Sequence, residues 1–161
     1  MYNPHKILKT LALALTASGA IFGGATSAFA GSCPASKVTT TNGQKAGATA
    51  HKGVEEKLLG AIDLAKEKVN VPGRLFRMRR LVIQPGGEVA WHSHEDRPAL
   101  IYVVSGAITE YSSHCTDPIE HKEGDLSLEQ AGLSHWWKNN SKGVVTLLSA
   151  DLAPAPDNHD M

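Results

Sequence analysis

Apolar and polar side chains alternate along most of the chain between residues 74 and 152, which is typical of β-strands with one buried face. The segment 74–84 alternates in this way, and Pro85-Gly86-Gly87 after it predicts a turn. Further strands are expected between glycine-containing turns, over residues 90–94, 99–105, 108–111, 126–128 and 144–152. The pattern as a whole predicts an all-β domain.

Three histidines stand at positions that suit a metal site. Side chains two residues apart in a strand point to the same face, so His92 and His94 can aim two imidazoles at one point. A third imidazole, His135, follows a glycine-containing turn and comes from a later strand. Three neutral imidazole nitrogens that converge inside a small barrel make a site for a divalent transition metal. The alternative is three ordinary histidines in a packed core.

Two blocks of sequence surround these histidines. The first reads Gly86-x5-His92-x-His94 and is closed by Gly106, and the second reads Gly124-x7-Gly132-x2-His135-x3-Asn139. These blocks resemble the two signature motifs of the cupin superfamily. The resemblance implies a single-domain jelly-roll barrel and a homodimer. It also favours a first strand near residues 58–64, where periodicity alone does not separate strand from helix.

The chain departs from the cupin motifs at two positions. The proline of the second motif is replaced by Gln130, and the position of the usual carboxylate ligand falls on Ala99. The resemblance therefore implies a ligand set of His92, His94 and His135 without an acid. Such a site keeps more positive charge and favours anionic ligands, and three-histidine iron sites occur among cupin-like dioxygenases. The residues do not distinguish iron, manganese, copper, zinc and nickel.

Four further side chains are expected to line a pocket beside the histidines. Trp137 shares the strand face of His135, and Ala99 shares a face with Ile101. Met78 is expected to point inward from an earlier strand. An apolar pocket of this kind would suit a small aromatic or aliphatic acid, although the same side chains could simply fill the barrel.

The residues directly after the histidine pair are charged. Glu95 follows His94 and should point away from the metal, because neighbouring strand residues face opposite ways. Glu95, Asp96 and Arg97 together are interpreted as a solvated loop. Arg97 is also a candidate for binding the carboxylate of a substrate.

The start of the chain has the features of an export signal. Residues 1–30 combine a positive beginning at Lys6 and Lys9, an apolar stretch and the cleavage signal Ala28-Phe29-Ala30. They are identified as a signal peptide. The protein is therefore expected to be periplasmic or secreted, without stable membrane insertion after cleavage.

Composition divides the rest of the chain into three parts. Residues 31–52 hold few large apolar side chains and are expected to form a flexible leader. The barrel is expected over residues 53–152, and residues 153–161 are expected to be a disordered tail.

Charge and cysteine content narrow the choice of partners. The whole chain has 16 basic and 16 acidic residues, and residues 1–30 contain two of the lysines and no acid, so the rest has a net charge of about −2. No basic stripe suggests nucleic acid as a partner, and a small molecule is expected instead. Cys33 and Cys115 are the only cysteines. They could pair in an oxidising compartment, but the sequence does not say whether they lie close together.

The sequence thus predicts an exported metal-binding protein that acts on or binds a small molecule. One hypothesis is an oxygenase-like oxidoreductase. The other is a non-enzymatic module of the cell envelope that captures a metal or a small acid. The cupin fold hosts many unrelated functions and does not choose between them.

Cleavage of the signal peptide is a direct test of the export hypothesis. Mass spectrometry of the protein from its native host should find a chain that begins at Gly31, because cleavage is expected after Ala30. A mature chain that still carries residues 1–30 would contradict export by this route.

Overall fold

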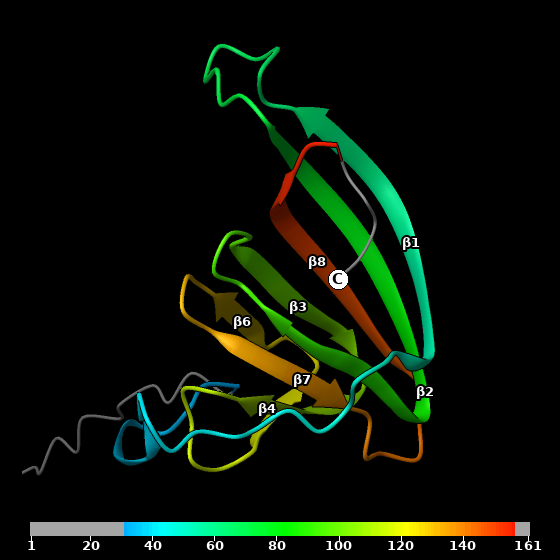
Figure 1. Cartoon of the computed structure of the whole chain (residues 1–161). Helices are drawn as coiled ribbons and strands as arrows, with labels where there is room; N and C mark the ends of the chain where they lie inside the picture. The colour runs from blue at the N-terminus through cyan, green and yellow to red at the C-terminus, as the bar shows by residue number, and fades with distance from the viewer. Residues whose placement is uncertain (1–30, 157–161) are drawn as a thin grey trace, which may run out of the picture.

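The computed structural model describes residues 31–156, and the predicted signal peptide, residues 1–30, and the last five residues lie outside this range. The described chain is all-β apart from one 3₁₀ helix, Ala35–Lys37, as expected from the alternating pattern. Eight strands form one curved sheet (Figure 1). They are β1 Lys52–Asp63, β2 Arg74–Ser93, β3 Ala99–Ser105, β4 Ala107–Ser112, β5 Ile119–Lys122, β6 Leu126–Glu129, β7 Ser134–Lys138 and β8 Val145–Pro154.

The strand order β5-β4-β7-β2-β8-β3-β6 closes the sheet into a jelly-roll barrel, with β1 paired to β2. The long strand β2 takes part in both halves of the barrel. Its residues 74–83 pair with β8, and its residues 88–93 pair with β7. The jelly-roll prediction is confirmed.

A bend in β2 makes this double role possible. Pro85-Gly86-Gly87 was expected to end a strand, but the strand continues through it. The backbone N–H of Gly86 donates to the carbonyl of Asn139 at 2.8 Å, and the N–H of Asn139 donates to the carbonyl of Gly87 at 2.9 Å. The Asn139 side chain is fully buried and donates to the carbonyl of Ile83 at 3.0 Å. The second motif's asparagine therefore fixes the bend of the first motif.

The core lies inside the barrel and contains inward-facing side chains of β2, β3, β4, β7 and β8. Its best buried apolar side chains are Ile83, Val89, Val103, Ile108, Trp137, Val145 and Leu147. On β2 the odd positions face inward before the bend, so Arg77 and Arg79 are buried and Met78 is 39% exposed. The expectation that Met78 lines the pocket is wrong, because Met78 stands at an even position and lies on the outer face.

A β-bulge then changes which residues of β2 face inward. Val89 pairs with Trp137, and His92 pairs with His135, so β2 advances three residues while β7 advances two. The extra residue reverses the alternation, since side chains normally switch faces at every step. Val89 and His92 consequently both point into the barrel, although they differ in parity.

The segment before β1 packs against the barrel instead of forming a flexible leader. A disulfide joins Cys33 to Cys115 with Cα atoms 5.7 Å apart, and Val38 forms a β-bridge with Cys115. Gly47 lies so close to Trp136 that a Cβ at this position would collide with the indole. Composition suggested flexibility because these contacts use small residues and backbone atoms. A cross-link across 82 residues stabilises such a fold by roughly 2–4 kcal/mol.

The barrel also extends beyond the expected end of the domain. Strand β8 continues to Pro154, and Ala153 is 1% exposed, so the chain is ordered past residue 152. The remaining part of the expected tail, residues 157–161, lies outside the described range. No helix in residues 31–156 is long and apolar enough to cross a membrane.

Candidate metal centre

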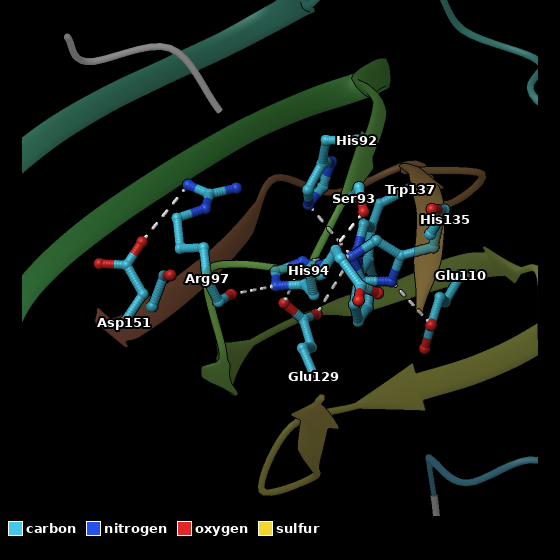
Figure 2. Close-up of polar contacts among 12 residues, drawn as sticks. His92, Ser93, His94, Arg97, Glu110, Glu129, His135, Trp137 and Asp151 are labelled. Atoms are coloured by element: carbon cyan, nitrogen blue, oxygen red, sulfur yellow. Dashed lines mark hydrogen bonds and ion pairs between the residues drawn. The ribbon is translucent and has the colours of Figure 1, made fainter. Parts of the chain in front are cut away.

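Four side chains from three parts of the barrel gather at one point (Figure 2). His92 lies near the end of β2, His94 directly after it, Glu129 at the end of β6 and His135 in β7. One potential ligand atom from each lies within 4.8 Å of all the others. His94, Glu129 and His135 are at most 2% exposed.

Each imidazole is oriented by a hydrogen-bond acceptor at its Nδ1 atom. His92 Nδ1 lies 2.8 Å from the carbonyl oxygen of Ala90, and His94 Nδ1 lies 2.8 Å from the carbonyl oxygen of Arg97. His135 Nδ1 lies 2.8 Å from Glu110 Oε1. Because these oxygens can only accept, each Nδ1 carries the proton. In the neutral rings the Nε2 atoms therefore have free lone pairs, the form that binds metals.

These three Nε2 atoms point at one another. His94 Nε2 and His135 Nε2 are 3.0 Å apart, and His135 Nε2 and His92 Nε2 are 3.1 Å apart. With all three rings in the Nδ1–H tautomer, no proton lies between these acceptors. Unshielded lone pairs at this distance repel, so the arrangement calls for a cation at its centre.

Glu129 adds a carboxylate to the same point. Glu129 Oε2 lies 2.8 Å from His94 Nε2, close enough for an ion pair with a protonated ring. This contact is not a hydrogen bond, because the proton of the neutral His94 ring is on Nδ1. Both carboxylate oxygens are buried without a hydrogen-bond donor in the described chain. An orphaned buried carboxylate beside three imidazole lone pairs fits a divalent transition metal.

The acid that the first motif lacks is supplied by the neighbouring strand. Ala99 of β3 is the register partner of Glu129 of β6, so the two side chains stand beside each other on the inward face. A carboxylate at position 129 can thus reach the place that a glutamate at position 99 would occupy. The expectation of a site without an acid does not fit this geometry.

Glu129 could have been suspected from its own strand. Leu126 and Leu128 are exposed, whereas Ser127 and Glu129 are buried, so the short strand carries its polar residues inward. An alternating strand with its apolar residues outside is unusual for a small barrel. What the sequence could not supply is the register between β3 and β6, which sets Glu129 opposite Ala99.

Charge and burial act differently on the three histidines. Burial, helped by repulsion from His135, lowers the pKa of His92 to about 2, which keeps this ring neutral. Burial alone would lower the pKa of His135, but the carboxylates of Glu129 and Glu110 outweigh it and raise that pKa. The negative charge that would favour a proton on His135 equally favours a metal cation.

Glu110 is a charged partner behind the site. Burial would raise its pKa, but hydrogen bonds from His121 and His135 lower it to about 2. Its two oxygens lie 2.8 Å from His121 Nε2 and 2.8 Å from His135 Nδ1. A carboxylate that holds the Nδ1 proton of a ligand histidine fixes the tautomer of the ring and increases the basicity of Nε2.

The spacing of the nitrogens constrains the coordination geometry. Two metal–nitrogen bonds of about 2.1 Å at right angles separate the nitrogens by about 3.0 Å, whereas tetrahedral angles separate them by about 3.4 Å. The observed separations of 3.0 and 3.1 Å match right angles. An octahedral ion would suit these separations, and the four protein ligands would leave two of its positions open.

A cavity of about 20 Å³ adjoins the histidines. Trp137 and Ile101 line it as expected, and the Trp137 indole Nε1 lies 3.4 Å from His135 Nε2. Ala99 is buried but does not line this cavity, whereas its cross-strand neighbour Glu129 does. Met78 lies on the outer face.

Beside the cavity lies a buried cluster of three arginines, one of which, Arg97, was expected in a solvated loop. Asp151 Oδ2 accepts from Arg77 and Arg79 at 2.8 Å each and from Arg97 at 3.3 Å. Arg97 is 8% exposed, so its loop is not solvated at this residue. Burial and repulsion from Arg79 lower the pKa of Arg97, while Asp151 raises it. Arg79 also pairs with Glu56 at 2.9 Å.

Comparison with known proteins agrees with this architecture. The family model for the cupin domain matches residues 79–151, which include all four clustered side chains. No curated protein sequence matches the chain significantly.

Solved structures show the same fold at low sequence identity. The cupin domain of Schizosaccharomyces pombe Cnp3 is 15% identical with a TM-score of 0.50, and the match covers 67% of this chain and 70% of that one. A predicted oxalate decarboxylase from Thermotoga maritima is 19% identical with a TM-score of 0.51, covering 75% of this chain and 97% of that one. An RmlC-like cupin from Shewanella frigidimarina is 14% identical with a TM-score of 0.51, covering 73% and 89%. The match to the cupin domain model over residues 79–151 and the shared fold of these structures support membership of the cupin superfamily.

Moving the carboxylate between strands tests the role of Glu129. Glu129→Ala should lower affinity for a divalent metal at least about tenfold, because one of four ligands is lost. Adding Ala99→Glu to that variant should restore part of the affinity, since position 99 lies opposite position 129. Competition against a fluorescent chelator measures both effects. The exposed Glu123→Ala variant is the matched control. Unchanged affinity in Glu129→Ala would show that the carboxylate is not a ligand.

Proposed function

We propose that this protein binds one divalent transition metal ion through His92, His94, His135 and Glu129 and acts on a small molecule at the ion. The observation that carries the proposal is the convergence of three imidazole Nε2 atoms with a buried carboxylate that has no hydrogen-bond donor in the described chain. Oxygenase-like oxidoreduction is the reaction that we favour. An ion of iron, manganese or copper would supply redox chemistry and open positions for a substrate and dioxygen.

The protein's own residues would prepare this site in three ways. Glu110 holds the Nδ1 proton of His135, so the ring presents Nε2 to the centre. Val89 and Leu147 give the cavity dry apolar walls. Trp137, which is 3% exposed, closes the wall next to His135. Excluding water strengthens electrostatic interactions inside the site and protects reactive species from side reactions.

Metal content and activity together separate the two functional hypotheses. The protein purified from its native export compartment should contain about one redox-active iron, manganese or copper ion per chain by elemental analysis, and should consume dioxygen with a small carboxylic acid as substrate. The His135→Ala variant should lose both properties, because it removes a central ligand. Zinc, nickel or no metal would instead favour a non-enzymatic binding module of the cell envelope.

Export to an oxidising compartment forms part of the proposal. The pair Cys33–Cys115 supports it, because disulfides persist in periplasmic and secreted proteins and are rare in the cytosol. Residues 1–30 have the composition of a signal peptide. The disulfide and the composition of residues 1–30 are independent observations that favour the same location.

We also propose that the protein is a homodimer. Its two copies would pair through the outer face of the strands β2, β8, β3 and β6. Cross-strand neighbours on this face form an apolar ladder, Met78–Ala150–Leu100–Leu128, flanked by a second ladder through Tyr102. Leu100 is 48% exposed and Leu128 is 60% exposed. An exposed apolar ladder of this kind, with the exposed Arg80 at the end of the flanking ladder, is compatible with a second copy of itself, as a two-fold interface requires.

Light scattering after size exclusion tests the dimer. The native protein should have twice the mass of the monomer, and Leu100→Lys should shift it to the monomer, because two lysines would be buried at the two-fold axis. Val38→Lys, at another exposed apolar residue, should leave the mass unchanged. A monomeric native protein would contradict the proposal.

A further inference from the structure

The cavity beside the metal site has charged walls that the four metal ligands do not explain. It is bounded by His92, His94 and Glu129 on one side and by Arg79 and Arg97 on the other. Both arginines are at least nine-tenths buried. Buried guanidinium groups are costly unless each is paired.

Arg79 and Arg97 share one carboxylate, that of Asp151, with a third arginine, Arg77. Asp151 Oδ2 already accepts hydrogen bonds of 2.8 Å from Arg77 and from Arg79. Arg97 reaches the same oxygen at only 3.3 Å, and this is the only hydrogen bond that its guanidinium makes to the described chain. Figure 2 shows the Arg97 guanidinium turned toward Asp151.

Arg79 also has unused hydrogen-bonding capacity. Its two terminal nitrogens bond to Glu56, Ser149 and Asp151. Its Nε is buried and has no partner among residues 31–156. A buried N–H without an acceptor costs on the order of 1–3 kcal/mol, so an additional acceptor in the cavity would be stabilised there.

We infer that Arg97 and Arg79 form an anion subsite next to the metal, and that the ligand of this protein is a small monocarboxylate. A divalent ion held by a single carboxylate keeps a net positive charge, so ion and guanidinium groups attract the same anion from two sides. The planar fork of arginine matches the two oxygens of a carboxylate.

The remaining walls define the rest of the ligand. Leu81, Ile101 and Leu147 line the same cavity and cannot hydrogen-bond. The cavity of about 20 Å³ exceeds the roughly 10–15 Å³ that one water requires but is small for a larger ligand. A cavity little larger than one water excludes a sugar or a phosphate ester, so the candidate ligands are the smallest carboxylates, of which acetate serves as the probe.

This inference rests on the proposed metal site, so the experiment measures metal and anion separately. The full mature chain is loaded with cobalt(II), its metal content is determined, and acetate is titrated by calorimetry and by the visible absorption of the cobalt. Acetamide, which has the same shape and no charge, serves as the neutral probe. Acetate should bind, and acetamide should bind at least about tenfold more weakly, because only the anion pairs with both charges.

Substitutions then assign the subsite to its residues. Arg97→Gln should weaken acetate binding at least about tenfold at unchanged cobalt content, and Arg97→Lys should lose less, since it keeps the charge but not the fork. Arg97 is the residue of choice because it makes one long bond, whereas Arg79 is tied to three partners. The control is Arg80→Gln, which removes an exposed arginine next to Arg79 on the outer face of β2 and should bind acetate normally.

The experiment separates failure of the anion subsite from failure of the metal site. Full cobalt content with acetate affinity unchanged in both Arg97 variants would overturn the subsite and leave the metal site standing. Full cobalt content with no acetate binding, or with equal binding of acetamide, would overturn it as well. Failure to bind cobalt would overturn the proposed function, and the anion subsite with it.

Discussion

The convergence of three unprotonated imidazole nitrogens and one buried carboxylate is the constraint on which the rest of this structure depends. Four acceptors within 4.8 Å of one another destabilise a fold unless a cation joins them. The surrounding contacts serve to keep them there. The carbonyl oxygens of Ala90 and Arg97 and the carboxylate of Glu110 hold the three Nδ1 protons, so no ring can turn its N–H toward the centre.

Backbone irregularities in β2 are what bring these groups together. The bend at Gly86 and Gly87 lets one strand serve both halves of the barrel, and Asn139 locks it. The bulge before His92 then reverses the alternation and points this ring inward. A regular strand with the same sequence would place Val89 and His92 on opposite faces. The motif glycines and the asparagine are therefore structural requirements of the metal site, although none of them is a ligand.

Sequence patterns predicted the fold and the histidines, because both depend on local spacing. Alternation and turn residues predicted the strands, and two histidines two apart predicted a shared face. The buried arginines and Glu129 were missed, since charged side chains enter a core only when partners from distant strands meet them. Arg77 and Asp151 are 74 residues apart, and Glu129 depends on the register between β3 and β6. The order of the segment before β1 was not predicted for the same reason, because the segment is held by a disulfide between cysteines 82 residues apart.

The most direct measurement of the central claim is X-ray absorption spectroscopy of the metal-loaded protein, compared with the Glu129→Ala and His135→Ala variants. The account predicts a six-coordinate ion with three imidazole ligands in the native protein, the loss of one imidazole in His135→Ala, and a changed oxygen shell with all three imidazoles kept in Glu129→Ala. A native spectrum with fewer than three imidazoles, or one that neither substitution alters, would place the ion elsewhere and contradict the account.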